Sequence, residues 1–412
     1  MVKPYVELMA PAGNFESMMA AIQGGANAVY FGIEQLNMRA RATMNFTIND
    51  LAKIAEVCEA NGVKSYITLN TILYDHDISL MKRIVDEAKK HRISAIIGAD
   101  QALIHYASTQ GMPVHISTQV NVSNIETVKF YALFADVMVL ARELSMKQMA
   151  EITRQIAQEQ IKGPSGELVR IEVFAHGALC MAVSGKCYLS LHTHNSSANR
   201  GVCIQNCRRT YEVKDREEGI EYHIENEYIM SPKDLNTLPF LDQLLDTGVD
   251  VLKIEGRARA PEYVKTVTRA YREAIDAVQE GSFSNEKVMA WQAAVEQVYN
   301  RGFWGGYYLG QKLGEWSDTY GSKATTKKVY LGKGRHYFNK LSVGEFLIES
   351  HTLNKGDKLL ITGPVTGVLE FEAEEIRVDN QPVDSAAKGT ACSLKVPEKI
   401  RPSDKLYKIV NA

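Results

Sequence analysis

The fold is decided by the stretch Lys64-Ser-Tyr-Ile-Thr-Leu-Asn-Thr71, which is followed by a helical pattern at Ser79–His91 and a second apolar run at Ser94–Gly98. A short run rich in β-branched and aromatic residues, an amphipathic helix and another short run predict two parallel strands joined by a crossover helix. The same alternation recurs on both sides of this stretch. Repeated strand–helix units indicate a parallel sheet that is covered by helices.

The number of these units predicts the architecture. The expected strands are Val6–Met9, Ala28–Gly32, Lys64–Thr71, Ser94–Gly98, Val114–Gln119, Val137–Ala141, Arg170–His176 and Asp250–Glu255. Eight strands with intervening helices make up a (β/α)8 TIM-like barrel, so we expect this α/β fold. Glu227–Met230 is a ninth candidate for eight places, and it is the one that we expect not to be a barrel strand. A doubly wound sheet is the alternative, but no G-x-G-x-x-G follows the first strand.

The end of the chain has a different pattern. Pro261–Gln279 predicts a helix, with proline in its first turn and Gly281 just after its end. Beyond Gly321, apolar runs separated by Gly, Asn, Asp and Pro predict a small all-β domain. These runs are Val329–Leu331, Val343–Ile348, Lys358–Thr362, Leu369–Val378 and Ala391–Val396. We therefore expect a barrel domain with its terminal helices at 1–320 and a β-barrel domain at 321–412.

The composition is that of an ordinary globular protein. Of its 412 residues, 45% are hydrophobic and 23% are charged, which excludes a largely disordered chain. The net charge is only −2, so any surface that binds nucleic acid must be local. No apolar run approaches the ~18 residues of a transmembrane helix, and the N-terminus lacks the apolar segment of a signal peptide. We therefore expect a cytoplasmic protein without a membrane partner.

Polar residues lie near the C-terminal ends of the predicted strands, where barrel enzymes place their catalytic groups. Residues two apart on a strand share a face, so Glu172 and His176 are expected on one face, as are Lys253, Glu255 and Arg257 on another strand. We interpret His176, Glu172, Lys253 and Glu255 as catalytic candidates. The alternative is an internal salt-bridge network, with Lys253 bound to Glu255 or Glu172, that only stabilises the barrel.

A second group of polar residues predicts a substrate-binding surface at the same end of the barrel. Its members are Arg39, Arg41, Asn70, His115, Gln119 and Arg257. The arginines suit a small anionic substrate, because a guanidinium fork matches a carboxylate. A Ser–His pair made by Ser117 and His115 is a weaker hypothesis, because no third group is evident to orient the histidine.

One loop-rich segment, 180–207, carries four of the six cysteines. They are Cys180, Cys187, Cys203 and Cys207, spaced C-x6-C-x15-C-x3-C. Four thiolates can bind a zinc ion or a [4Fe–4S] cluster. Structural zinc sites favour C-x2–4-C pairs, and only the second pair fits, so the spacing favours a cluster and leaves zinc as the alternative metal. Two disulfides are a third alternative. Cys58 and Cys392 are expected to be buried core residues.

The cysteine segment carries a resemblance to a known family. Glu172-Val-Phe-Ala-His-Gly-Ala-Leu-Cys180, continuing through Met-Ala-Val-Ser-Gly-Lys to Cys187-Tyr-Leu-Ser190, resembles the signature of the peptidase U32 family, often called collagenase-like proteases. Asn199-Arg-Gly-Val-Cys203-Ile-Gln-Asn-Cys207-Arg208 resembles the second half of the family's cysteine segment. Further blocks that resemble the family are Ala10–Gly13, Ala28–Gly32, Ser231–Leu235, Lys253–Arg257 and Asn300–Phe303. The resemblance covers the whole chain, including the C-terminal β-barrel.

The resemblance implies hydroxylation more than proteolysis. The better-understood branches of this family are hydroxylases that act without molecular oxygen, carry a [4Fe–4S] cluster on four cysteines and take the hydroxyl group from prephenate. In length and domain content the chain looks most like the branch that forms 5-hydroxyuridine at wobble position 34 of tRNA. The alternatives are the branch that hydroxylates a cytidine of 23S rRNA, and a U32-type peptidase as the family name states. The sequence has no H-E-x-x-H or G-x-S-x-G peptidase motif.

A tRNA partner needs a local cationic surface, and Lys323–Lys340 is the candidate. It contains six basic residues and no acidic one, with Tyr330, Tyr337 and Phe338 interleaved. Lysine and arginine contact phosphates, and aromatic side chains stack on the bases of single-stranded or loop RNA. The alternative is a solvated strand face next to a linker.

Overall fold

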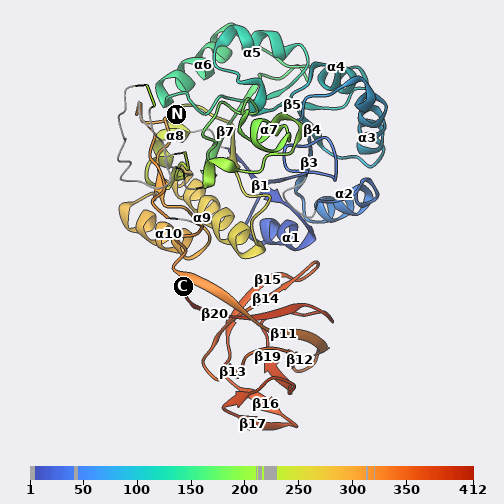
Figure 1. Ribbon diagram of the computed structural model, residues 1–412, viewed down its shortest axis with the longest axis vertical. Coiled ribbons are helices and arrows are strands. Elements are labelled where there is room, and N and C mark those ends of the chain that lie inside the picture. Colours follow the sequence, from blue (N-terminus) through green and yellow to red (C-terminus); the bar gives the residue numbers. More distant parts are fainter. Residues whose placement is uncertain are drawn as a thin grey trace.

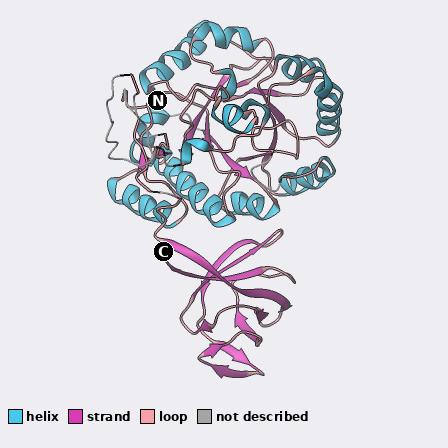
Figure 2. Ribbon diagram, in the orientation of Figure 1, coloured by secondary structure: helices cyan, strands magenta, loops and turns pink. Residues whose placement is uncertain are grey.

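The computed structural model describes residues 5–40, 45–209, 211, 216–217, 230–311, 314–319 and 321–412. Its larger part is a closed parallel barrel surrounded by helices (Figures 1 and 2). The strands are β1 Glu7–Ala12, β2 Ala28–Phe31, β3 Lys64–Leu69, β4 Ala95–Gly98, β5 Val114–Ile116, β6 Val137–Val139, β7 Arg170–Gly177 and β9 Val251–Ile254. Each pairs with the next, and β9 pairs with both β7 and β1, which closes the ring. The predicted TIM-like fold is confirmed, and the closure excludes a doubly wound sheet.

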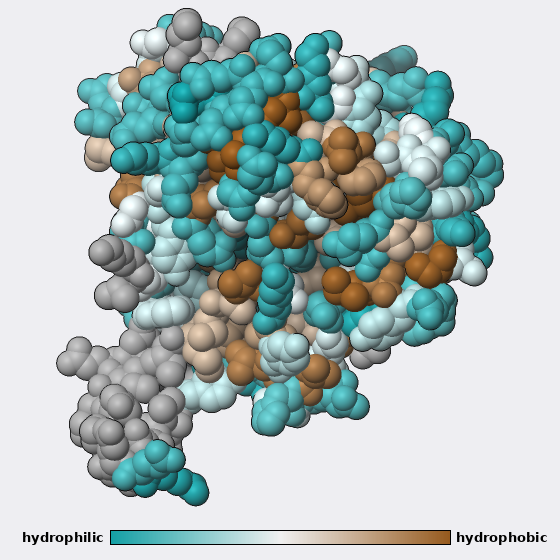
Figure 3. Space-filling view, turned by 90° about the horizontal axis from the view of Figure 1, so that it is seen from above, coloured by the Kyte–Doolittle hydropathy of each residue, from teal (hydrophilic) through white to brown (hydrophobic). Residues whose placement is uncertain are grey.

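The helices lie outside the barrel because each has one apolar face that packs on the strands. They are α1 Phe15–Gln23, α2 Leu51–Ala60, α3 Ile78–Lys90, α4 Gln101–Thr109, α5 Ile125–Ala132, α6 Met146–Glu159, α8 Leu241–Asp246, α9 Pro261–Gln279 and α10 Asn285–Gln297. Asparagine or aspartate side chains cap α1, α4 and α5. Figure 3 shows the face of the molecule that carries α5 and α6. Hydrophilic side chains cover most of this face, and apolar side chains lie in separate spots.

Two short strands extend the sheet beyond the ring. β8 Asp234–Asn236 pairs antiparallel with β7, and β10 Phe303–Trp304 pairs with β8. The sequence did not predict them, because each has only two or three residues. Positions 227–229 of the ninth strand candidate lie outside the described residues. The cysteine segment contains helix α7, Leu189–His194, which lies in front of the barrel in Figure 1.

The C-terminal part is an antiparallel β domain with its own apolar core. Its strands are β11 Thr326–Phe338, β12 Val343–Ile348, β13 Leu353–Asn354, β14 Lys358–Gly363, β15 Gly367–Glu372, β16 Ile376–Val378, β17 Gln381–Val383, β18 Ser385–Ala386, β19 Ala391–Lys395 and β20 Lys405–Asn411. The expected strand Leu369–Val378 is two strands, because the chain turns away from β14 after Glu372 and pairs with β19 from Ile376. The central strand β20 was not predicted.

The β domain packs directly on helices α1 and α9. The Gln23 side chain donates to the Thr366 carbonyl oxygen at 2.9 Å and accepts from the Val368 amide at 2.9 Å. Lys265 donates to the Val368 carbonyl oxygen at 2.7 Å, and Lys328 forms an ion pair with Glu262 at 2.9 Å. These contacts fix the position of the β domain against helices α1 and α9. The expected boundary near Tyr320 falls on a residue outside the described ranges.

None of the helices in the described ranges is long and apolar enough to cross a membrane.

Candidate active site

A cavity of about 310 Å³, which we call the central cavity, opens at the C-terminal ends of the barrel strands. Strand ends form its floor, and the cysteine segment forms its cover. Ten residues predicted from the sequence line it: Arg39, Asn70, Gln119, Lys253, Glu255, Arg257, Cys180, Cys187, Cys203 and Cys207. Arg41 lies outside the described residues. The fold thus brings the polar strand ends and the cysteines to one place.

Glu172 and Lys253 form an ion pair inside the barrel. The Lys253 ammonium lies 2.7 Å from a Glu172 carboxylate oxygen, and both side chains are buried. Lys253 also lines the central cavity, whereas Glu172 lies behind it. Burial raises the pKa of Glu172, against the effect of Lys253. The salt-bridge alternative therefore describes Glu172 well, and only Lys253 faces the cavity.

The two expected histidines do not line the central cavity. A β-bulge between Phe174 and His176 shifts the register of β7, so that His176 leaves the face it would share with Glu172. Its ring packs against Tyr271 and Phe303, with ring centroids 5.5 and 5.4 Å away. Burial lowers the pKa of His176 to about 3, which keeps the ring neutral. The expected proton shuttle is thus placed away from the cavity.

His115 lies in the barrel interior against Tyr66, with ring centroids 4.5 Å apart. Burial lowers its pKa to about 3 as well. Ser117 hydrogen-bonds with Gln119 and with the Asn70 amide rather than with His115. Asn70 also donates to Gln119 at 3.1 Å and accepts from the Met38 amide at 3.1 Å. The Ser–His hypothesis has no geometric support, whereas Asn70 and Gln119 form a polar wall.

Arg257 is a buried guanidinium held by neutral groups. It donates to the Asn37 side-chain oxygen at 3.1 Å and to the Thr68 hydroxyl at 3.0 Å, and it is 6% exposed. Burial lowers its pKa. A side chain at Gly32 would place its Cβ 2.2 Å from the guanidinium, so glycine in the Ala28–Gly32 block makes room for this arginine. The structure contains no carboxylate partner for Arg257 among its described residues.

Glu255 is the carboxylate that faces the central cavity. Burial acts to raise its pKa, but the cations of Arg39, Arg142 and Arg257 outweigh burial and lower it. Arg39 lies 3.3 Å from one carboxylate oxygen, and the Tyr30 hydroxyl donates to the other at 3.2 Å. Glu255 is therefore ionised at neutral pH.

Three cationic residues of the cavity, Arg142, Arg259 and Arg301, were not predicted from the sequence, whereas Arg208 is a cation that flanks the cysteines in the sequence. Arg142 stacks on the Phe174 ring, 3.7 Å from its centroid, and donates to the Ala178 carbonyl oxygen at 3.0 Å. Its Nε atom is buried and has no partner in the described residues. No local sequence motif marks these three arginines, although Arg301 lies within a block that resembles the family.

The cavity is strongly cationic. Arg39, Arg142, Arg208, Lys253, Arg257, Arg259 and Arg301 line it, against the single carboxylate of Glu255. Lys253, Arg39 and Arg301 have carboxylate partners, the last in Asp234 at 3.5 Å. Arg142 and Arg257 have only neutral partners among the described residues. Glu255 is near enough to interact with both through its charge but forms no ion pair with either, so two partly or fully buried guanidinium groups can still bind an anionic ligand.

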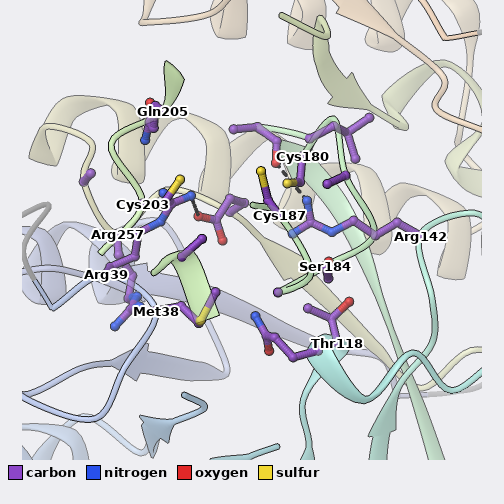
Figure 4. A pocket seen from close by; sticks show the side chains of 18 of the residues that line it. Met38, Arg39, Thr118, Arg142, Cys180, Ser184, Cys187, Cys203, Gln205 and Arg257 are labelled. Carbon is purple, nitrogen blue, oxygen red and sulfur yellow. Dashed lines mark hydrogen bonds and ion pairs between the residues drawn. The ribbon is translucent and has the colours of Figure 1, made fainter. Parts of the chain in front are cut away.

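All four cysteines of the segment are free thiols. In Figure 4, the Arg142 guanidinium points toward Cys180 and Cys187, and Cys203 lies on the side of Arg39 and Arg257. Arg208 holds the segment in place, donating to the Ser231 hydroxyl at 2.8 Å and to the Leu179 carbonyl oxygen at 2.8 Å.

Four free thiols line one cavity and are flanked by arginines. A tetrahedral zinc site needs four ligands around one point. A [4Fe–4S] cluster takes one thiolate at each of four separate iron atoms, so its ligands surround a larger volume. Within the described residues, no three Cys, His, Asp or Glu side chains are grouped around a single point. The four cysteines supply the donor set that either group requires.

The fold and the cavity define a TIM-barrel protein with a cationic mouth beside four cysteines. The chain belongs to the family described as Peptidase family U32, whose model matches residues 13–318. It is 59% identical to a Porphyromonas gingivalis protein named "Collagenase", over 98% of this chain and 97% of that protein. The resemblance stated from the sequence is thereby confirmed.

Two further relatives are named for RNA modification. The chain is 34% identical to "tRNA hydroxylation protein P1" of Bacillus subtilis, over 66% of this chain and 63% of that protein. It is also 34% identical to "23S rRNA 5-hydroxycytidine C2501 synthase" of Escherichia coli, over 67% of this chain and 40% of that protein. The family thus contains proteins named for RNA hydroxylation as well as for proteolysis.

Proposed function

We propose that this protein is an iron–sulfur RNA hydroxylase that forms 5-hydroxyuridine at wobble position 34 of tRNA, with prephenate as the hydroxyl donor. The observation that carries the proposal is the central cavity, where four free cysteines lie beside guanidinium groups that lack a carboxylate partner in the described residues. The relatives named for tRNA hydroxylation support the RNA substrate.

The cavity suits a donor with two carboxylates. Arg257 lies in the loop after β9 and Arg142 in the loop after β6, so the two guanidinium groups reach the cavity from different parts of the barrel mouth. Each can offer N–H groups to one carboxylate without breaking an existing ion pair. Prephenate carries two carboxylates, and charge-assisted hydrogen bonds to guanidinium groups are short and strong. Asn70 and Gln119 line the same cavity and would contact its neutral groups.

Cys180, Cys187, Cys203 and Cys207 would hold the [4Fe–4S] cluster, which supplies the redox chemistry of the reaction when bound. The net reaction exchanges a C–H bond of uracil for a C–O bond, which oxidises the base by two electrons. A donor that gives up its hydroxyl and takes the hydrogen is reduced by the same two electrons, so atoms and electrons balance without molecular oxygen.

Glu255 is the residue best placed to take the proton from C5 of the base. It is ionised, it faces the cavity, and Arg39 and Tyr30 fix its carboxylate. The Lys253 ammonium, held 2.7 Å from the Glu172 carboxylate, would position the groups at the floor of the cavity beside Glu255. The cysteine segment covers the cavity and so limits the access of water to the reacting atoms.

A peptidase is the second candidate, because the relative at 59% identity is named "Collagenase". The residues that line the central cavity include cysteines and serines but, in the described part of the chain, no histidine. A cysteine or serine nucleophile with a histidine base therefore has no arrangement there. Cysteines that bind a cluster are also unavailable as nucleophiles.

Anaerobic purification tests the proposal. We expect broad absorption near ~400 nm with about four iron and four sulfide per chain, and 5-hydroxyuridine in tRNA after incubation with prephenate. Zinc without colour would favour a structural metal site. Gelatin cleavage that survives removal of all four cysteines would favour the peptidase, and 5-hydroxycytidine in 23S rRNA would favour the ribosomal substrate.

A further inference from the structure

A second cavity, of about 430 Å³, lies between the barrel and the β domain. We call it the interdomain cavity. Its walls are the start of α9, the end of α10, the first residues of β11 and parts of β14, β15 and β20. It is separate from the central cavity, but Ala258 and Arg259 line both. The short segment after β9 is thus a shared wall.

An arginine–tyrosine stack forms one side of the interdomain cavity. The Arg259 guanidinium carbon lies 3.6 Å from the centroid of the Tyr299 ring, and both side chains are half-exposed. The Tyr299 hydroxyl donates to the Gly321 carbonyl oxygen at 3.0 Å, which fixes the ring. Arg259 has no carboxylate partner in the described ranges. Aromatic rings and guanidinium planes are the surfaces on which proteins stack unpaired RNA bases.

Charged groups of the β domain line the same cavity and complement the other parts of a nucleotide. Lys327 is exposed and has no acidic partner among the residues that the structure describes. Lys328 and Glu262 neutralise each other at 2.9 Å. Glu370 of β15 also lines the cavity, and a carboxylate can accept a hydrogen bond from a base N–H group. The Tyr299 ring also has the Arg301 guanidinium 5.2 Å from its centroid, so the guanidinium plane of Arg259, supported by Tyr299, is the stacking surface. Lys327 would bind phosphate, the Arg259–Tyr299 stack would receive the base, and Glu370 would contact the base edge.

We propose that the interdomain cavity binds a nucleotide of the RNA strand next to the target base. The inference rests on the proposed function and deepens it, since it states how the RNA reaches the central cavity. A strand that places one base in the central cavity can reach the interdomain cavity past Ala258 and Arg259, which line both. The next cavity along that wall offers a stack and two unpaired cations. A free nucleotide has the same chemistry and is the alternative occupant.

The test measures the affinity for a fluorescein-labelled anticodon stem–loop RNA by fluorescence anisotropy. Tyr299→Leu removes the aromatic face, and Tyr299→Phe keeps it while removing the hydroxyl, so Tyr299→Phe is the matched control. We expect Tyr299→Leu to weaken RNA binding about tenfold and Tyr299→Phe to bind like the wild type. Lys327→Ala, at an exposed position that does not affect folding, should reduce the salt slope of binding by about one. The absorption of the central site should stay unchanged, and a cooperative thermal transition should show that each variant is folded.

The outcomes separate this inference from the proposed function. Wild-type RNA binding that survives Tyr299→Leu and Lys327→Ala unchanged would overturn the inference and leave the proposed function intact. If the wild-type protein binds uridine monophosphate through Tyr299 but binds no RNA, the cavity is a site for a free nucleotide. That result would overturn both the proposed RNA-strand site and the proposed RNA hydroxylase function.

Discussion

Arg257→Gln separates the binding role of this arginine from its structural role. The glutamine keeps a polar group near Asn37 and Thr68 but removes the positive charge. Both neighbours retain other hydrogen bonds, since the Asn37 oxygen accepts from the Arg39 amide at 3.0 Å and the Thr68 hydroxyl donates to the Phe31 carbonyl oxygen at 2.8 Å. The protein also loses a buried charge that has no carboxylate partner in the described residues. The thermal midpoint should therefore stay the same or rise.

The affinity for the donor should fall sharply in the same variant. A hydrogen bond to a charged group contributes about 1.5–3 kcal/mol, so losing it should raise the KM for prephenate about 10- to 150-fold. The assay is mass spectrometry of tRNA nucleosides over a prephenate titration, with calorimetry for direct binding. Arg269→Gln, at an exposed position on α9, is the control and should leave both unchanged. An unaltered KM in Arg257→Gln would refute the assignment of this arginine to the donor.

Three further predictions concern the cofactor, the acid stability and the β domain. Cys180→Ala should abolish the absorption near ~400 nm and Cys58→Ala should not; bleaching by both would show that the ligand set is wrong. The pKa of His176 is about 3 in the folded protein against about 6.5 when unfolded, so the unfolded chain binds more protons and stability falls as the pH drops below about 6.5. Urea unfolding of His176→Phe should therefore lose about 2 kcal/mol less than wild type between pH 7.5 and pH 5, and an equal loss would contradict the burial of a neutral ring. Arg335→Glu with Lys340→Glu should weaken tRNA binding and flatten its salt dependence, whereas unchanged affinity would remove the outer part of β11 from the RNA surface.

The choice of Arg335 and Lys340 for the last of these variants depends on the structure and could not be made from the sequence alone. Lys323–Lys340 contains no acid, but the fold supplies acids from elsewhere: Lys323 pairs with Asp318 at 2.5 Å and Lys333 with Glu349 at 2.8 Å. Lys328 pairs with Glu262 at the contact with α9. The cationic segment is therefore partly neutralised, and substitution of Lys328 would disturb the domain contact. Arg335 and Lys340 are exposed and avoid this problem.

The barrel was predictable because strand and helix periodicities are local. The same is true of the site residues that follow strands, such as Asn70 and Arg257, since strand ends of a closed barrel meet at one mouth. His176 was misplaced because a bulge in β7 depends on pairing with β9, which strict alternation does not show. Arg142 was missed because its importance depends on contact with Phe174, far away in the sequence.

The central claim is tested most directly by following the oxygen atom. Anaerobically purified protein would be incubated with tRNA and with prephenate that carries ¹⁸O in its hydroxyl group, and the nucleosides would be analysed by mass spectrometry. The account predicts 5-hydroxyuridine that contains the heavy isotope, formed by wild type and not by a variant that lacks the four cysteines. Absence of 5-hydroxyuridine with cluster-loaded protein, or a product whose oxygen comes from water, would contradict it.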